Sequence, residues 1–263
     1  MIRSISITDE IWDSRGQRYE ESITKWPSVM EPNIKYVLGA LNLSKTDHIL
    51  EFSAGSGFLT LPLAERLTLG RIEAQDVSKV MLGYLENKIT DKNLNNISIN
   101  HCDSPDLKGF ESAAYDKIVT LGGFHHVPDQ ITVAKAFHRC LKPGGKAVIA
   151  DFADSSNTQR HFDITVEKFS STGHSCLFIS PSRCENLAKF AKFVDVEVFE
   201  LNIPWVFDSE TDIGEFFRLH HDLQGIDDGA VYSAVKEHLG VLKVNAHYEV
   251  PLQYCISVMT KGL

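Results

Sequence analysis

The chain has 263 residues, of which 43% are hydrophobic and 23% are charged, and its formal net charge is −9. These values are typical of a globular protein that buries a substantial core, as one large domain or as one domain with an appended cap. An acidic chain without a basic cluster is poorly suited to hold a phosphate backbone, so we expect no nucleic-acid partner.

The cysteines and the N-terminus favour a cytoplasmic location. The five cysteines are scattered without a C-x-x-C pair, which indicates neither a disulfide framework nor a zinc ribbon. The first 22 residues carry charges throughout and lack the apolar core of a signal peptide, and no later segment has the length of a membrane span. We therefore expect a mature, soluble chain without a membrane span, and the sequence leaves its oligomeric state open.

The first 44 residues form a segment of their own. Its pattern predicts short helices, with Pro27 and Pro32 as breaks between them. We interpret residues 1–44 as an N-terminal helical cap and residues 45–263 as the main domain.

From residue 45 to 151 short apolar runs alternate with longer amphipathic ones. The runs predict strands at 48–52, 71–76, 97–102, 115–121 and 145–152, and helices at 58–67, 78–92 and 129–141. Such alternation predicts an α/β fold, a Rossmann-like and mostly parallel sheet with helices on both faces. In such sheets ligands bind beyond the carboxyl ends of the strands, near the point where the strand order reverses.

The segment ILEFSAGSGFLT places a glycine-rich turn, Ser53 to Gly57, between the first strand and the first helix. Glycine permits a positive φ and lets a ligand approach the backbone closely. The spacing E-x-S-x-G-x-G lacks the third glycine of the dinucleotide fingerprint, and the carboxylate of Glu51 would repel a pyrophosphate. Asp76 stands 19 residues beyond Gly57, where a ribose acceptor is expected, although it could instead cap the next helix. The pattern favours a ligand that has a ribose but no diphosphate.

Five segments resemble, in order and spacing, the motifs of class I S-adenosylmethionine-dependent methyltransferases: ILEFSAGSG, AQDVSKVML, NHCDSPDL, YDKIVTLGGFHHVPD and LKPGGKAVIADF. They cover about residues 45–152. The resemblance implies S-adenosylmethionine as the cofactor and methyl transfer as the reaction. One departure is Ser53, where the family usually has glycine; a serine fits there if the residue needs no positive φ.

The resemblance also implies a set of cofactor contacts. Glu51 and the turn after it would face the methionyl part, Asp76 would bind the ribose hydroxyls, and Asp103 with Ser104 would lie near the adenine amino group. Asp103 could instead be a turn residue before a proline. The full set implied is Tyr19, Glu51, Ser53, Gly55, Gly57, Asp76, Val77, Asp103, Ser104, Leu121 and Gly122.

Two of these contacts rest on particular features. The backbone at Leu121 and Gly122 would bind the methionyl ammonium. The pattern of Trp12, Asp13 and Tyr19 resembles that of related enzymes, in which the N-terminal segment folds over the cofactor. Tyr19 is therefore a candidate contact to the methionyl end, or else an aromatic ring that packs under the cap.

Beyond residue 151 the pattern predicts the end of the sheet and an insertion. Helices are expected at 155–170 and after Ser180, which stands before Pro181 as an N-cap, and strands at 193–201 and 251–262, the last antiparallel, for seven in all. Two helical patterns fall within 208–243, which we interpret as a lid over the active site. Ten of the 15 phenylalanines follow residue 150, which suits a core and also an apolar pocket for a hydrophobic or aromatic small molecule.

Histidines are the candidates for catalysis. His125 and His126 follow the fourth predicted strand, where a general base would have to stand, although H-H-x-P-D could equally be a structural turn. Further candidates are His161, His174, His220 and His221. We expect no metal, because no pair of histidines has the i, i+4 spacing of a helical ligand site and no set of carboxylates accompanies them.

The leading hypothesis is S-adenosylmethionine-dependent methyl transfer to a small, hydrophobic or aromatic metabolite, from a quinone, lipid or natural-product pathway. An alternative keeps the cofactor but uses it for cyclisation, rearrangement or transfer of another group. A binding or regulatory protein that retains only the fold is disfavoured, because the residues that such a protein could lose are present: Glu51, Gly55, Gly57 and Asp76.

Overall fold

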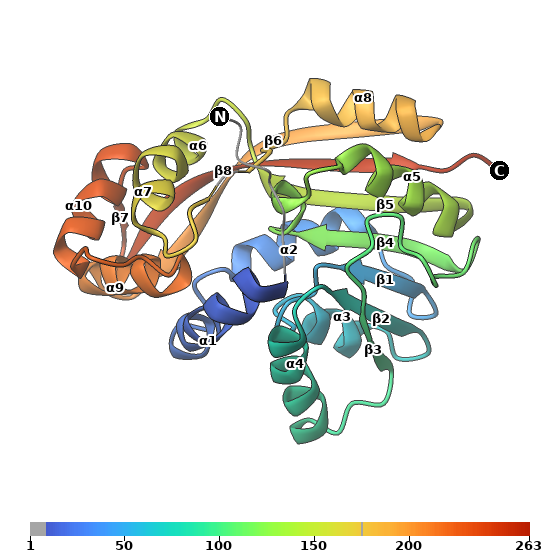
Figure 1. Ribbon diagram of the computed structural model, residues 1–263, viewed down its shortest axis with the longest axis horizontal. Helices are drawn as coiled ribbons and strands as arrows, with labels where there is room; N and C mark the ends of the chain where they lie inside the picture. Colours follow the sequence, from blue (N-terminus) through green and yellow to red (C-terminus); the bar gives the residue numbers. More distant parts are fainter. Residues whose placement is uncertain (1–8, 175) are drawn as a thin grey trace.

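The computed structural model describes residues 9–174 and 176–263, and in the helix that begins at Asp9 it describes side chains from Trp12 onward. One eight-stranded sheet runs through the molecule, with helices on both of its faces and a helical lobe at one end (Figure 1). This confirms the predicted Rossmann-like fold. Among the described helices none combines the length and the apolar character that crossing a membrane requires.

The first five strands are parallel and form the half of the sheet that was predicted from alternation. They are β1 (His48–Phe52), β2 (Arg71–Asp76), β3 (Ile97–His101), β4 (Tyr115–Leu121) and β5 (Leu141–Phe152). Their order is β3-β2-β1-β4-β5, so the chain leaves β1 toward one edge and later returns to its other side. The switch point, where ligands of such sheets bind, therefore lies between β1 and β4.

Helices cover the two faces of this half. One face carries α2 (Glu31–Leu41), α3 (Thr60–Arg66) and α4 (Lys79–Asp91), and the other carries α5 (Gln130–Cys140) and α8 (Pro181–Ala191). The hydroxyl of Ser78 accepts a hydrogen bond from the N–H of Met81, and the carboxylate of Asp129 accepts one from Thr132. These N-caps satisfy N–H groups that a helix start leaves unpaired, and so define where α4 and α5 begin.

The last strands extend the sheet beyond its parallel half. β6 (Asp195–Phe207) and β8 (His247–Thr260) run antiparallel, and the short β7 (Leu242–Val244) pairs with β8, which makes eight strands instead of the expected seven. Phe152, the last residue of β5, lies opposite Tyr254, which lies opposite Leu201. The rest of β6 and the start of β8 therefore project past the carboxyl end of β5, on the side where ligands bind.

A helical lobe, made of α6, η2, α7, α9 and α10, lies at the projecting ends of β6 and β8. Between β6 and β7 the chain forms α9 (Glu210–His220) and α10 (Asp228–His238), within the insertion expected at 208–243. The helix expected at 155–170 consists of α6 (Asn157–His161), the π-helical turn η2 (Phe162–Val166) and α7 (Glu167–Phe169). Both groups of helices lie at the same end of the molecule (Figure 1).

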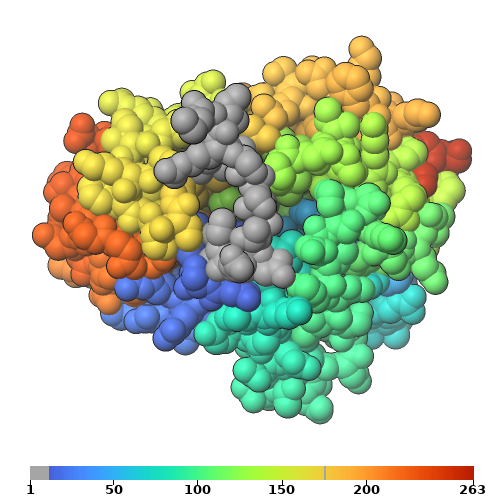
Figure 2. Space-filling view, viewed as in Figure 1, coloured from blue at the N-terminus to red at the C-terminus, as the bar shows by residue number. Residues whose placement is uncertain are grey.

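The N-terminal helices join the lobe to the sheet. α1 (Asp9–Lys25) and α2 are separated near Pro27, but Pro32 lies in the first turn of α2 and does not break a helix, because a helix start needs no N–H from that residue. Arg18 pairs with Asp222 at 3.1 Å, next to the C-terminal end of α9. In Figure 2 the yellow and orange segments of the lobe lie directly against the blue of α1.

One apolar core continues from the sheet into the lobe. It includes Ile49 of β1 and Leu63 of α3 together with Trp205, Phe216 and Phe217 of the lobe, all of them at most 1% exposed. The lobe therefore packs on the sheet as part of one hydrophobic core.

Candidate active site

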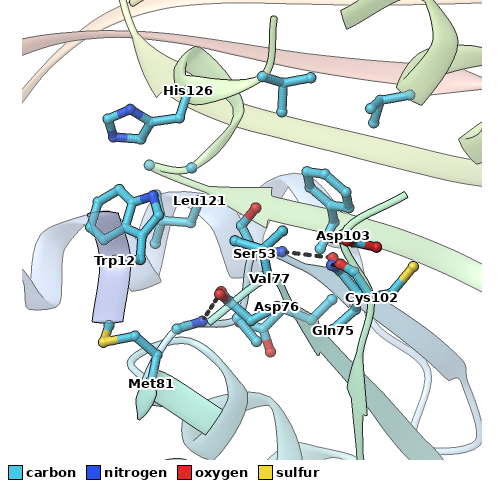
Figure 3. Close-up of a pocket in the computed structure, with 18 of the residues that line it drawn as sticks. Trp12, Ser53, Gln75, Asp76, Val77, Met81, Cys102, Asp103, Leu121 and His126 are labelled. Carbon is cyan, nitrogen blue, oxygen red and sulfur yellow. Dashed lines mark hydrogen bonds between the residues drawn. The ribbon is translucent and has the colours of Figure 1, made fainter. Parts of the chain in front are cut away.

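A cavity of about 460 Å³ opens at the carboxyl ends of β1, β2 and β4, beside the switch point (Figure 3). Every residue of the implied cofactor set lines it except Gly57: Tyr19, Glu51, Ser53, Gly55, Asp76, Val77, Asp103, Ser104, Leu121 and Gly122. Gly57 has a φ of 93°, and a Cβ there would lie 2.5 Å from Cδ1 of Leu85. A side chain at this position would therefore collide with Leu85 of α4, and glycine lets the turn pack close to that helix.

Asp76 lies at the end of β2 with both carboxylate oxygens held in place. Oδ2 accepts a hydrogen bond from the N–H of Gly55 at 2.7 Å (Figure 3), and Oδ1 accepts one from the N–H of Ser78 at 2.9 Å. The cap of α4 is the hydroxyl of Ser78, so Asp76 is not needed as a helix cap. Each oxygen keeps a further acceptor site, which leaves the carboxylate able to bind a pair of hydroxyl groups.

Glu51 supplies a buried carboxylate at the end of β1. Its side chain is 3% exposed, and Oε2 has no hydrogen-bond partner within the described part of the chain. Burial raises the pKa of Glu51 to about 8. An unpaired buried carboxylate is unfavourable, and a cationic group in the cavity would relieve that cost. Glu51 therefore fits the ammonium and sulfonium charges of S-adenosylmethionine.

Ser53 corrects one expectation, because its φ is 58°, in the left-handed region that the serine was expected to avoid. Its N–H donates to Oε1 of Gln75 at 3.3 Å, and Nε2 of Gln75 donates to the carbonyl of Cys102 at 2.5 Å (Figure 3). A Cβ on Gly123 would lie 2.5 Å from Cβ of Ser53. The turn after β1 and the loop after β4 thus approach one another at the cavity, and the backbone contacts of Ser53 hold it in the less favourable conformation.

Three other residues implied as cofactor contacts line the same cavity, and two of them, Ser104 and Gly122, make hydrogen bonds within the protein. The hydroxyl of Ser104 donates to Asp106 at 2.5 Å, as in the turn that was the alternative for this region, and Asp103 is exposed. The N–H of Gly122 donates to the carbonyl of Ala150 at 2.9 Å, within the sheet. At Gly122 the carbonyl oxygen is thus the group left to meet an ammonium.

Helix α1 forms one wall of the cavity through Trp12 and Tyr19. The carboxylate of Asp13 accepts a hydrogen bond from the hydroxyl of Ser78 at 2.6 Å, which fixes α1 to the start of α4. The ring of Trp12 meets the ring of His126 edge to face, with centroids 4.8 Å apart, on the opposite wall. The rings of Trp12 and Tyr19 therefore line the cavity, and the hydrogen bond of Asp13 to Ser78 holds their helix in place.

The two histidines that follow β4 point to different places. His126 lines the cavity, whereas His125 does not: its ring is 2% exposed, and its Nδ1 lies 2.6 Å from Oδ1 of Asp151. Burial lowers the pKa of His126 well below 6.5. Of the two, only His126 can touch a molecule in the cavity.

The structure adds neighbours to this pair that spacing along the chain did not predict. Sγ of Cys176 lies 3.3 Å from Nδ1 of His126 and 3.3 Å from Nδ1 of His174. Asp151 stands at the carboxyl end of β5, a position that could have been recognised from the predicted sheet alone. Cys176 gave no such signal, because it lies outside any regular element.

The remaining candidate histidines lie in the lobe. Nδ1 of His161 is 3.3 Å from Nδ1 of His238, and Nδ1 of His220 is 3.0 Å from the hydroxyl of Ser22. The ring of His221 packs against Trp205, with centroids 6.2 Å apart. None of His161, His220 and His221 is among the residues that line the cavity.

Sequence comparison finds relatives for part of the chain. Residues 49–145 match the family model for a methyltransferase domain. The demethylmenaquinone methyltransferase of Alkalihalophilus pseudofirmus is 32% identical over 116 residues, 43% of this chain and 48% of that protein. The enzyme of the same name from Geobacillus stearothermophilus is 32% identical over 115 residues, 43% of this chain and 49% of that protein. The chain thus spans about half the length of these curated relatives.

Solved structures show the same fold over most of the chain. The YcgJ protein of Bacillus subtilis has a TM-score of 0.67 at 13% identity, covering 88% of this chain and 98% of that one. Phosphoethanolamine N-methyltransferase 2 of Haemonchus contortus, in complex with S-adenosyl-L-methionine, has a TM-score of 0.67 at 16% identity, covering 95% of this chain and 57% of that one. These matches identify residues 49–145 as a methyltransferase domain of the class I, S-adenosylmethionine-dependent type.

Proposed function

We propose that this protein transfers the methyl group of S-adenosylmethionine to a small hydrophobic or aromatic acceptor. The observation that carries the proposal is the composition of the cavity wall. The carboxylate of Glu51, whose Oε2 has no hydrogen-bond partner within the described residues, lies in the same cavity as the rings of Trp12, Tyr19 and His126. A cationic methyl donor thus has a counter-charge, and a flat acceptor has aromatic surfaces to pack against.

The acceptor class is narrowed by the relatives. The two curated relatives above are named demethylmenaquinone methyltransferases, and the identity to each extends over 43% of this chain. A quinone-type ring would suit the contact between Trp12 and His126, where two rings already meet edge to face. We therefore place a reduced quinone, which carries phenolic hydroxyls and ring carbons able to accept a methyl group, first among the acceptors.

In this proposal the residues act mainly by position. The cofactor supplies a methyl group that its sulfonium already activates, so holding the acceptor in line supplies much of the rate. Glu51 and Asp76 fix the cofactor, and His126, which borders the cavity, contacts the acceptor. His125 has no access to the cavity and acts by holding the loop after β4 to Asp151.

The insertion at 208–243 would act as a lid over the acceptor. Its helix α9 packs on α1, which is itself a wall of the cavity. The rings of Tyr19 and His220 have centroids 4.7 Å apart, and the guanidinium of Arg15 donates to the carbonyl of His221 at 3.3 Å. Because Tyr19 touches both the cavity and the lid, closing of the lid and filling of the cavity are coupled in this arrangement.

The test is a turnover assay with product analysis. The purified protein is given S-adenosylmethionine with a demethylated naphthoquinol, with a catechol, or with no acceptor, and both products are followed by mass spectrometry. We expect S-adenosylhomocysteine and methylated quinol in equal amounts. The variant Asp76→Asn, which keeps the size of the side chain and removes its charge, should require more cofactor for the same rate.

Each other result has a defined meaning. Consumption of the cofactor without S-adenosylhomocysteine would favour the alternative chemistry of cyclisation, rearrangement or transfer of another group. Tight cofactor binding without turnover of either aromatic acceptor would refute the acceptor class. Failure of the folded protein to bind S-adenosylmethionine would refute the proposal as a whole.

A further inference from the structure

Four side chains of the kinds that bind metals meet beside the cofactor cavity: His125, His126, His174 and Cys176. The first two belong to η1 (Phe124–His126), and the other two lie in the segment between α7 and α8. One ligand atom from each of the four lies within 4.8 Å of the other three. The segments that carry them are 48 residues apart, so the group exists only in the folded chain.

The distances within the group suit a single ion. Sγ of Cys176 is 3.3 Å from Nδ1 of His126 and 3.3 Å from Nδ1 of His174. A tetrahedral zinc ion holds nitrogen at about 2.0 Å and sulfur at about 2.3 Å, which places two such ligands roughly 3.3 to 3.6 Å apart. These two sulfur-to-nitrogen distances suit ligands on adjacent corners of one coordination sphere, and the other ligand atoms, which lie within 4.8 Å, would move closer together on binding an ion.

His125 gives a second and independent indication. Its Nε2 is buried and has no hydrogen-bond partner within the described part of the chain, which is unfavourable for a polar atom. Its Nδ1 lies 2.6 Å from Oδ1 of Asp151, whose Oδ2 accepts a hydrogen bond from the N–H of His125 at 2.8 Å. An imidazole with one nitrogen on a carboxylate and the other unpaired is the usual arrangement of a histidine that binds a metal.

The backbone holds the two segments together without an ion. The N–H of Leu177 donates to the carbonyl of His125 at 2.8 Å, and Nε2 of Gln130 donates to the carbonyl of Leu177 at 2.8 Å. The ligands are thus brought to one place by hydrogen bonds that do not involve their own side chains. Such preorganisation lowers the conformational cost of binding an ion.

We propose that His125, His126, His174 and Cys176 bind one divalent ion of the zinc class, with Asp151 orienting His125. Three imidazole nitrogens and one thiolate select such an ion over magnesium or calcium, which prefer oxygen ligands. The thiolate of Cys176 and the carboxylate of Asp151 supply two negative charges that balance the charge of a divalent ion. This proposal replaces the expectation of no metal, which rested on the lack of histidine pairs with i, i+4 spacing and of an accompanying set of carboxylates.

The ion would stand next to the reaction chamber. His126 lines the cofactor cavity, so an ion on its Nδ1 would fix the ring that faces the acceptor. It would also tie the segment before α8 to the loop after β4. Of the four proposed ligands His126 borders the cavity, and the inference does not depend on which acceptor is methylated.

Arg15 offers the competing explanation for Cys176. Its side chain is 4% exposed and its Nε has no partner within the described residues; its charge lowers the pKa of Cys176, but burial raises that pKa by more. A thiolate paired with Arg15 would need no ion. The two explanations differ in whether the thiol responds to added metal.

The first experiment uses the full-length, tag-free protein after treatment with a chelator, titrated with Co²⁺ and then with Zn²⁺. We expect one equivalent of cobalt to bind, with the visible bands of tetrahedral cobalt and a thiolate-to-cobalt charge-transfer band, and zinc to displace it. Cys176→Ser should abolish the charge-transfer band and weaken binding by roughly 100-fold or more, because even orienting residues are worth up to that factor. Cys102→Ser, a partly exposed thiol outside the group, should retain both.

A second measurement keeps the test valid if Cys176→Ser does not fold. In the wild-type protein, bound zinc should slow alkylation of Cys176 by iodoacetamide, and a chelator should restore the rate. An unchanged rate would assign the thiol to Arg15 and refute the metal site. The metal site would also be refuted if the folded wild-type protein binds no cobalt, or if the charge-transfer band persists in Cys176→Ser. Calorimetric titration with S-adenosylmethionine, done separately, keeps these outcomes distinct from failure of the proposed methyl transfer.

Discussion

The cofactor half of this molecule, residues 48–152, and the half that we propose binds the acceptor, which is formed by α1 with residues 153–174 and 176–263, are assembled in different ways. In the cofactor half, consecutive strands and helices bring short motifs such as Glu51 to Gly57 to one edge of the sheet. In the acceptor half, side chains from opposite ends of the chain meet, as Tyr19 does with His220. The part that matches the methyltransferase domain, residues 49–145, lies within the first half.

This difference indicates where specificity would lie. Most of the cofactor site lies within residues 49–145, which match the family model, whereas the walls contributed by α1 and the lobe lie outside that range. Yet both halves are parts of one apolar core, which runs from Ile49 in β1 to Phe217 in α9. We infer that the halves differ in function but unfold together.

The largest effect should come from the shared core. Phe217 is fully buried and packs against Trp205, so Phe217→Ala should lower the free energy of unfolding by roughly 3 to 5 kcal/mol. Phe190, which is 56% exposed, is the matched control, and Phe190→Ala should change the free energy of unfolding by less than about 0.5 kcal/mol. Urea unfolding followed by fluorescence and by circular dichroism measures both. Two separated transitions would show that the halves are independent folding units.

A comparably large effect is expected at Glu51, and it should depend on pH. Because burial raises the pKa of Glu51 to about 8 from an ordinary 4.5, its ionisation opposes folding as the pH rises between these values. Glu51→Gln cannot ionise, so the cofactor-free variant should match wild type below about pH 4.5. Above about pH 8 the free energy of unfolding of the variant should exceed that of wild type by on the order of 3 to 5 kcal/mol.

Unfolding by urea at several pH values tests this prediction, and parallel stability curves for Glu51→Gln and wild type would refute it. The same substitution should weaken cofactor binding, since it removes the counter-charge. In wild type below about pH 8, binding should release a proton from Glu51, because a cation favours the carboxylate form. Calorimetry in buffers of different ionisation enthalpy detects that proton.

A smaller effect, confined to the cofactor half, is predicted for Asp76. Asp76→Ala should weaken S-adenosylmethionine binding about tenfold or more, because charge-assisted hydrogen bonds of roughly 1.5 to 3 kcal/mol are lost. Asp91→Asn, on the exposed end of α4, should bind as wild type does. Calorimetric titration of the folded proteins gives both affinities. If Asp76→Ala binds the cofactor unchanged, the ribose site lies elsewhere.

The sequence predicted the parallel half well because each of its elements carries a local pattern. The antiparallel end was predicted less fully: the strand expected at 193–201 continues to Phe207, through Pro204, which faces Pro251 in register. A proline lacks the N–H of a strand and argues against one in a sequence, but β6 is an edge strand with an unpaired side that tolerates it.

The candidate site divides in the same way. Glu51 and Asp76 were identified because each ends a strand whose position the pattern fixed. The group around Cys176 was missed because its contacts join two segments that no periodicity relates, and a search for ligands one helical turn apart excludes them. Ser53 was misjudged for a different reason: its backbone conformation is set by Gln75 and by the approach of Gly123, both of which lie far from it in the sequence.

That conformation leads to the smallest predicted effect. A serine at a φ of 58° carries a strain of roughly 1 to 2 kcal/mol that glycine does not, while glycine adds roughly 0.4 to 1 kcal/mol of chain entropy to the unfolded state. Ser53→Gly should therefore raise the free energy of unfolding by up to about 1 kcal/mol. Ala54→Gly, at the next position and without a positive φ, should lower it by about the same amount. Equal signs for the two substitutions in urea unfolding would show that the bonds of Ser53, and not its φ, decide the stability of this turn.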